Sequence, residues 1–251
     1  MLKLTLDNLS VARHGTRILR GISATLSAGT LTSVIGRNGS GKTTLLKAIA
    51  GLLPAEGTVR LEDAGESLTQ AAIAYVPQLS SVETRLTVTE LVLLGLVREL
   101  GWRVSDEIRA RVADTLAMLG IEHLATRTLN TLSGGQKQLV FMAQAFVSRP
   151  RLLLLDEPTS ALDLKHQLIV MNAARRYTEE TGAIMIAVVH DLLLASRVSD
   201  QLLLLDAGGV RATGPVAEVL TPTLLQAAFG VSVSVEPTRA GCLAVVPLAP
   251  L

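Results

Sequence analysis

The chain has 251 residues, enough for one large α/β domain or for a domain that carries an inserted subdomain. Its formal net charge is +1 and no block of like charge stands out, which argues against a basic nucleic-acid surface, so we expect no nucleic-acid partner. Hydrophobic residues make up 49% of the chain, yet its apolar runs are far shorter than the ~18 residues of a membrane-spanning helix. We therefore expect part of the apolar surface to be buried against another subunit.

The single cysteine, Cys242, rules out an internal disulfide and is typical of a reducing compartment. Residues 1–7 alternate like a strand and lack the order of charged, apolar and small residues that marks a signal peptide. We therefore expect a protein that is made and kept in the cytoplasm.

Residues 2–35 predict an antiparallel β layer, because apolar residues alternate along them between turns that contain glycine. The end of this segment, residues 31–35, is an apolar and β-branched run that predicts a strand. Apolar residues then recur at helical spacing over residues 42–50. The glycine-rich residues 36–43 thus join a strand to a helix, which is the context of a phosphate-binding loop.

Residues 36–43 fit the phosphate-loop pattern of two glycines separated by four residues and followed by Lys and Thr. Glycines let backbone N–H groups point at phosphate oxygens, and the helix N-terminus adds a favourable partial charge. We expect Lys42 to reach the β and γ phosphates and the Thr43 hydroxyl to coordinate Mg²⁺. The predicted nucleotide-binding residues of this segment are Gly36, Arg37, Asn38, Gly39, Ser40, Gly41, Lys42, Thr43 and Thr44.

The middle of the chain predicts a helical insertion. Strands at residues 57–61 and 73–76 precede it, and residues 87–129 then place apolar side chains at three- and four-residue steps. Ser133 is a plausible N-cap for a further helix from about residue 136 to residue 147. The predicted division of this single domain is a nucleotide-binding core of residues 1–78 and 151–230, a helical subdomain of residues 79–150 and a C-terminal tail of residues 231–251.

Residues 152–155 form an all-apolar run that ends in an acid, the pattern of a buried parallel strand whose C-terminal end carries function. A helix is predicted over residues 164–181, and residues 183–189 form a second buried strand that ends at His190. The remaining predicted elements are a helix at 192–198, a hairpin of strands at 201–206 and 210–213, and one or two short helices within 215–229. The tail has alternating apolar residues and three prolines, and we assign no structure to it.

Four side chains follow predicted strands at the edge of the sheet where ligands bind in open parallel sheets. Asp156 would hold Mg²⁺, and Glu157 would orient and polarise the attacking water. His190 would contact the γ phosphate or hold the water and Glu157 in place, the alternative being a solvated histidine in a turn. Gln78 would reach Mg²⁺ or the attacking water, whereas a lone glutamine is otherwise ordinary surface.

Together these features resemble the ATP-binding cassette (ABC) ATPases. The matching parts are residues 36–43, Gln78, the pentapeptide Leu132-Ser133-Gly134-Gly135-Gln136, residues 152–157, residues 160–163 and His190, in the family's order and spacing over residues 2–230. The resemblance implies an α/β P-loop NTPase fold with a parallel core sheet, an N-terminal antiparallel β layer and an inserted α-helical subdomain. It also implies that the chain is an ATPase with ATP and Mg²⁺ as ligands.

In that family two copies pack head to tail, so the resemblance implies a homodimer. Each nucleotide then lies between the phosphate loop of one chain and the signature pentapeptide of the other. Ser133 and the N–H groups of Gly134 and Gly135, followed by Gln136, would form the second phosphate cradle at a helix N-terminus. Asp163 would make a contact across the interface.

The likeness narrows to the ATPase subunits of importers for ferric siderophores, haem and cobalamin, which residues 87–92, 160–167 and 190–192 resemble. It implies a peripheral subunit on the cytoplasmic face of the inner membrane, docked under a separate permease that a substrate-binding protein feeds. Two alternatives stay open, namely an ABC exporter ATPase and a non-transport ABC ATPase of DNA repair or the ribosome.

Three positions depart from the family's pattern. Where relatives stack an aromatic residue on adenine, this chain has Arg13 and His14, whose side chains can also stack on a base, and we expect weaker base discrimination. Leu139 stands where relatives have a basic residue after the signature, and residues 95–98 lack the Gly-Arg-x-Pro pattern of the importer group.

Overall fold

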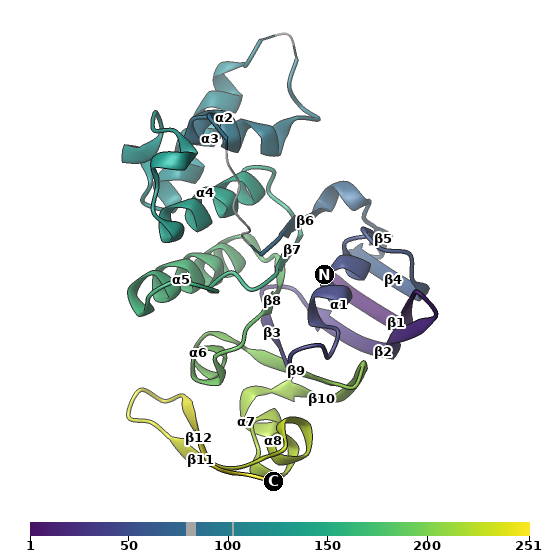
Figure 1. The fold of residues 1–251 in the computed structure, drawn as a ribbon. Coiled ribbons are helices and arrows are strands. Elements are labelled where there is room, and N and C mark those ends of the chain that lie inside the picture. Colours follow the sequence, from purple (N-terminus) through teal and green to yellow (C-terminus); the bar gives the residue numbers. More distant parts are fainter. Residues whose placement is uncertain (79–83, 102) are drawn as a thin grey trace.

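The computed structural model describes residues 1–78, 84–101 and 103–251, and a six-stranded sheet forms its centre (Figure 1). The strands of this sheet are β3 (Leu31–Ile35), β6 (Ile73–Val76), β7 (Leu152–Leu155), β8 (Ile184–Val188), β9 (Gln201–Asp206) and β10 (Gly209–Pro215). Their order is β10-β9-β3-β8-β7-β6, and all neighbours are parallel except the edge strand β10. Strands β7 and β8 are buried along their whole length, which explains why both are wholly apolar.

A second, antiparallel sheet lies beside the central one (Figure 1). Its strands are β1 (Lys3–Arg13), β2 (Thr16–Ser27), β4 (Glu56–Asp63) and β5 (Glu66–Ser67), in the order β2-β1-β4-β5. Helix α1 (Lys42–Ile49) lies between the two sheets, because Leu45 and Leu46 share one hydrophobic core with Leu4 of β1 and Leu154 of β7. The predicted antiparallel β layer is confirmed.

Helices cover the opposite face of the central sheet (Figure 1). They are α4 (Gly134–Phe146), α5 (Leu164–Thr181) and α6 (Leu192–Val198). Alternate side chains of β7 point to opposite faces of the sheet. Leu152 and Leu154 pack in the core around α1. Leu153 and Leu155 pack in the core under helices α4, α5 and α6. The predicted parallel core sheet with helices packed on it is therefore confirmed.

The chain between β6 and β7 forms a helical segment at one end of the molecule (Figure 1). After η1 (Gln70–Ala72) and β6 come α2 (Val88–Leu93), η2 (Leu94–Leu96), α3 (Asp106–Met118), η3 (Glu122–Leu124), η4 (Leu129–Thr131) and α4. Helices α2 and α3 pack on α4, which also contacts α5 and β6. The predicted helical pattern is confirmed, and the expected boundary at residue 79 lies outside the described residues.

The C-terminal residues form two helices and a hairpin. These are α7 (Val216–Val219), α8 (Pro222–Phe229), β11 (Val231–Pro237) and β12 (Leu243–Pro250). The hairpin packs on α8 and α6, and Leu243 N donates to Ser196 Oγ at 2.7 Å. The hairpin accommodates its prolines because both of its strands are edge strands. In an edge strand, some backbone N–H groups form no hydrogen bond to a neighbouring strand, and proline can stand at those positions.

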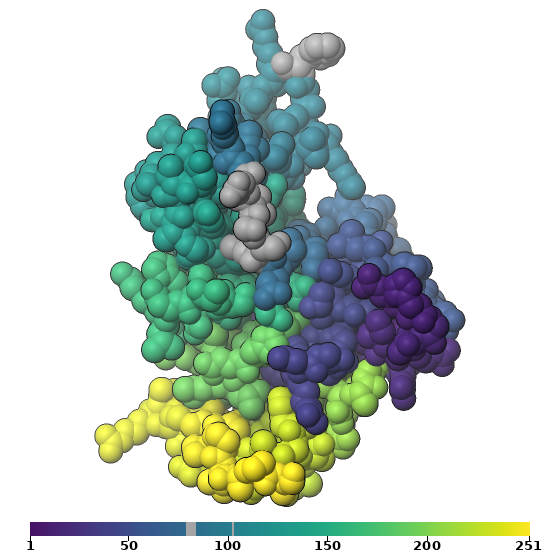
Figure 2. Space-filling view, in the orientation of Figure 1, coloured from purple at the N-terminus to yellow at the C-terminus, as the bar shows by residue number. Residues whose placement is uncertain are grey.

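In the space-filling view the hairpin (yellow) and the helical segment (teal) lie at opposite ends of the molecule (Figure 2). Among the helices of the described residues, none combines the length and apolar character that crossing a membrane requires.

Candidate nucleotide-binding site

The loop between β3 and α1 depends on its glycines. Gly36 and Gly41 have φ angles of 149° and 102°, in the region that favours glycine. A side chain on Gly36 would collide with the carbonyl oxygen of Leu205 in β9, and one on Gly41 would collide with the Leu19 side chain of β2. Glycine at both positions lets the loop lie against these strands, and α1 begins directly behind it at Lys42.

Lys42 lies across this loop. Its Nζ donates to the carbonyl oxygens of Gly36 and Arg37, each at 2.9 Å, and its side chain is buried. Burial lowers the pKa of Lys42, while the negative charges of Glu157 and Asp156 oppose that shift. Phosphate oxygens can replace the two carbonyl oxygens as partners of this ammonium group.

Ser40 adds a buried hydroxyl to the same loop. Its Oγ has no hydrogen-bond partner among the described residues. A buried hydroxyl without a partner is unfavourable unless a ligand satisfies it. The buried cation, the unsatisfied hydroxyl and the helix N-terminus therefore fit a phosphate group.

Asp156 and Thr43 meet at the edge of this site. Thr43 Oγ1 donates to Asp156 Oδ1 at 2.8 Å, and Tyr75 Oη donates to Asp156 Oδ2 at 2.9 Å. In the part of the chain that the structure describes, no three His, Cys, Asp or Glu side chains gather as metal ligands. Mg²⁺ needs no such group, because it binds through one or two carboxylates, substrate phosphates and water, so one carboxylate beside one hydroxyl fits it.

Glu157 lies between Gln78 and His190. Gln78 Nε2 donates to Glu157 Oε2 at 2.8 Å, and His190 Nε2 lies 2.7 Å from Glu157 Oε1. The Glu157 backbone has φ 52°, a left-handed conformation that is costly for a non-glycine residue and is often found at functional sites. This turn directs the carboxylate away from buried β7 towards the ends of β6 and β8, where it can orient a water molecule.

A cavity of about 830 Å³ gathers these groups. It is lined by Ile18, Asn38, Gly39, Gly41, Lys42, Thr43, Thr44, Glu157 and His190. Arg13 and His14, the candidates for adenine stacking, are absent from this lining, and both are exposed at the β1–β2 turn. The residue of that hairpin that reaches the cavity is Ile18.

The pentapeptide forms a separate helix N-terminus. Ser133 Oγ accepts from Gln136 N at 3.3 Å and Ser133 N donates to Gln136 Oε1 at 3.1 Å, so the two residues form a capping box. Helix α4 therefore begins at Gly134, not near residue 136 as predicted, because the cap fixes both glycines in the first turn. No residue of the pentapeptide lines the cavity of the phosphate loop.

Comparisons with known proteins agree with this geometry. Residues 19–160 match the family model described as ABC transporter. The chain belongs to the ABC transporter ATP-binding family. It is 38% identical over 254 residues to the cobalamin import ATP-binding protein BtuD of Halobacterium salinarum, covering 98% of this chain and 64% of that protein. The chain thus spans less than two thirds of the length of that relative.

Two further matches extend over nearly the whole of both chains. The hemin import ATP-binding protein HmuV of Rhizobium meliloti is 38% identical over 250 residues, covering 93% of this chain and 94% of that protein. A solved structure of a metal-chelate type ABC transporter in an inward-facing conformation has a TM-score of 0.87 and 27% identity, covering 99% of this chain and 98% of that one. The predicted family and fold class are confirmed, and ATP is the nucleotide of that family.

The fold of this ABC subunit brings the predicted catalytic groups together, and it adds groups that the sequence did not reveal. Ile18 and Tyr75 were not predicted as site residues, since each reads only as part of an apolar strand. Ser160 was quoted only as part of a motif, and its Oγ accepts from Gln78 Nε2 at 3.5 Å. No signal in the sequence pointed to Ile18, because the position of the β1–β2 hairpin beside the phosphate loop follows from the tertiary structure.

Asp163 lies at the N-cap of α5, beside the signature helix. It accepts hydrogen bonds from His166 N at 2.8 Å and lies 2.8 Å from His166 Nδ1, and the bond from the His166 backbone is the main cause that lowers the pKa of Asp163. The His166 ring occupies the position that a side chain on Gly135 would take. The signature needs glycine there because the same chain packs a histidine on it.

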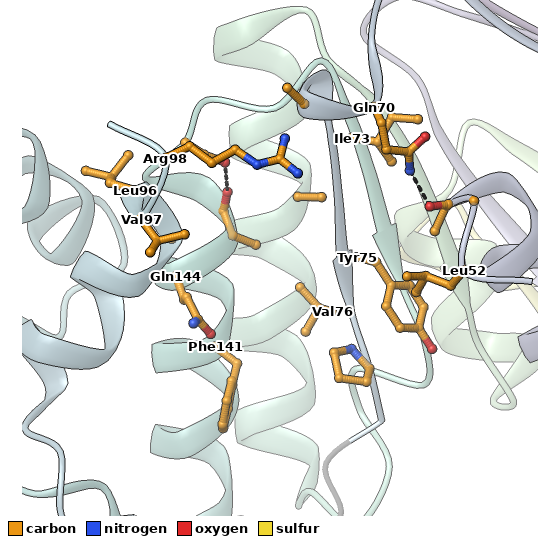
Figure 3. A pocket seen from close by; sticks show the side chains of 18 of the residues that line it. Leu52, Gln70, Ile73, Tyr75, Val76, Leu96, Val97, Arg98, Phe141 and Gln144 are labelled. Carbon is orange, nitrogen blue, oxygen red and sulfur yellow. Dashed lines mark hydrogen bonds between the residues drawn. The ribbon is translucent and has the colours of Figure 1, made fainter. Parts of the chain in front are cut away.

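A groove separate from the nucleotide cavity runs over the edge strand β6 (Figure 3). It measures about 680 Å³, and its walls come from η1 and β6 on one side and from the η2 region and α4 on the other. Leu52 and Val97 expose apolar side chains there, and Arg98 and Glu99 add charged ones. This ABC subunit therefore has a mixed apolar and charged groove between its sheet and its helical segment.

Proposed function

We propose that the chain is the ATP-hydrolysing subunit of an importer that takes up a metal chelate, haem or a corrinoid. The observation that carries the hydrolytic role is Glu157, which lies between Gln78 and His190 at the mouth of the phosphate-loop cavity. The import direction and the substrate class rest on the relatives, which are named for cobalamin and hemin import.

In this proposal the chain's own groups divide the work on ATP. Lys42 pairs with the phosphates, Glu157 orients and polarises the attacking water, and His190 and Gln78 hold Glu157 in place. Thr43 and Asp156, with Gln78 nearby, would hold Mg²⁺, which when bound neutralises charge on the phosphate oxygens.

We propose a homodimer in which two copies pack head to tail. The support is that the cavity contains one phosphate cradle, whereas the second, at Ser133 to Gln136, lies elsewhere on the chain. A second copy would bring its signature residues over the phosphate loop and its Asp163 to the interface. ATP would close this pair, and loss of the γ phosphate would release it.

We propose that membrane permease subunits dock in the groove over β6, which places the subunit on the cytoplasmic face of the inner membrane. The exposed Leu52 and Val97 beside Arg98 and Glu99 suit a protein segment with both apolar and charged side chains (Figure 3). A substrate-binding protein would deliver the cargo to that permease. The division into a core, a helical subdomain of residues 79–150 and a C-terminal tail is part of the same proposal.

We propose that Arg13 or His14 stacks on the adenine. Both residues belong to the β1–β2 hairpin, and Ile18 of the same hairpin lines the cavity. A guanidinium or imidazole group stacks on any base, so ATP and GTP should bind with similar affinity. Calorimetric titration with the two nucleotides tests this, and a strong preference for ATP would contradict it.

The test of the whole proposal is to purify the chain with its permease and measure ATP hydrolysis in the presence of ferric chelates, haem or corrinoids. One of these classes, presented by its binding protein, should stimulate hydrolysis. Stimulation by DNA or ribosomes instead would contradict the transport role, and a permease that works without a binding protein would favour export.

A further inference from the structure

Tyr75 lies between the groove and the nucleotide cavity. Its ring lines the groove with Ile73 and Leu52 (Figure 3), while its Oη donates to Asp156 Oδ2 at 2.9 Å. The side chain comes from β6, whose partner in the sheet is β7, the strand that ends next to Asp156. One side chain therefore contacts both sites.

The two oxygens of the Asp156 carboxylate accept hydrogen bonds from residues of different sites. Its Oδ1 accepts from Thr43, which lines the nucleotide cavity, and its Oδ2 accepts from Tyr75, which lines the groove. Asp156 is only 3% exposed, so water cannot readily substitute for either partner. The orientation of this carboxylate therefore depends on the position of the Tyr75 hydroxyl.

We propose that Tyr75 is a positioning residue that couples the occupancy of the groove to the Mg²⁺-binding carboxylate of Asp156. The proposal rests on the proposed function, because the occupant of the groove is the permease. A permease segment in the groove contacts the Tyr75 ring, displaces its hydroxyl and reorients the carboxylate beside Thr43. Hydrolysis thereby responds to the partner through two hydrogen bonds.

The first test compares Tyr75→Phe with the matched control Tyr177→Phe. The Tyr177 hydroxyl also donates to a single partner, the carbonyl oxygen of Pro150 at 3.1 Å, and Tyr177 is more deeply buried than Tyr75. Calorimetry measures how much Mg²⁺ increases the affinity for ATP, and Tyr75→Phe should reduce this increase about tenfold, the effect of one hydrogen bond to a charged group. Wild-type behaviour of Tyr75→Phe, or an equal loss in both variants, would overturn the proposal.

The second test measures how much the permease stimulates ATP hydrolysis in the assembled complex. Tyr75→Phe should lose most of the stimulation, whereas Tyr177→Phe should keep it. Equal stimulation of both variants contradicts the coupling alone. If the permease does not stimulate the wild-type subunit, the proposed function is contradicted, and so is the claim that a permease in the groove acts through Tyr75. The calorimetric test is independent of the permease and still tests whether the hydrogen bond between Tyr75 and Asp156 supports Mg²⁺ binding.

Discussion

The phosphate loop and the signature pentapeptide both place backbone N–H groups at a helix N-terminus, but their surroundings differ. Around the phosphate loop the same chain supplies Lys42, Asp156 and Glu157. Around the signature, Ser133 is exposed and its capping box with Gln136 uses hydrogen bonds within the helix itself. The phosphate-loop end therefore combines its backbone N–H groups with charged side chains, whereas the signature end has backbone N–H groups and an exposed serine.

This difference indicates how the two ends would share the work in the proposed dimer. Affinity for the nucleotide should reside in the phosphate-loop end, because its buried cation and unsatisfied hydroxyl belong to a single chain. Turnover should need both ends. Substitutions at the two ends should therefore separate binding from hydrolysis.

The largest effect on nucleotide binding is expected for Lys42→Ala at the phosphate-loop end. Loss of the ammonium group should weaken ATP binding roughly 100-fold or more, since two or more charge-assisted hydrogen bonds to phosphate are removed. Calorimetry measures this, with Lys47→Ala in the last turn of the same helix as the control. Equal ATP affinity of the two variants would contradict the role of Lys42.

Glu157→Gln should separate binding from turnover within the same end. The amide cannot polarise water as a carboxylate does, so hydrolysis should fall by about 10²- to 10⁴-fold while ATP binding and dimer formation persist. Steady-state turnover and gel filtration with ATP measure the two properties. The control is Glu180→Gln on the exposed face of α5, and turnover near wild type in Glu157→Gln would remove this residue from the mechanism.

Ser133→Ala tests the signature end. Turnover should fall about tenfold for one lost hydrogen bond to a phosphate, while the affinity of the isolated chain for ATP stays unchanged. Ser105→Ala is the matched control, because Ser105 Oγ also caps a helix by accepting from Ile108 N at 3.3 Å, and losing such a cap costs about 1 kcal/mol. Equal turnover in the two variants would show that the serine acts only as a cap.

The smallest effect concerns Asp163, next to the signature. Hydrogen bonds from His166 hold the pKa of Asp163 below its ordinary value of 3.8, so the stabilisation is present above that pH and is lost as the pH falls through the lower folded value. Asp163→Asn removes this dependence. The Tm of wild type should exceed that of Asp163→Asn slightly at neutral pH, and this difference should shrink in acid. A difference independent of pH would contradict the assignment.

Local sequence was sufficient where an element carries its own boundary signals. The helix predicted at about residues 164–181 agrees with α5, whose start is capped by Asp163 and whose end is marked by Gly182 in a left-handed conformation. The predicted bounds of α6 and β9 also agree with the structure, in which Asp191 caps α6 and an apolar run forms β9. Residues 231–251 gave no such signals, and their hairpin forms because α6 and α8 offer a surface to pack on.

The sequence by itself determined the phosphate loop, because glycine positions and a neighbouring lysine express their chemistry within eight residues. It also determined which strand ends carry acidic and imidazole groups. Only the tertiary structure decided that Glu157 meets both Gln78 and His190, and that Tyr75 holds the carboxylate of Asp156 from the side of the groove. The physical reason is that these contacts join residues far apart in the chain, whose distances depend on the order of the strands in the sheet and not on any local pattern.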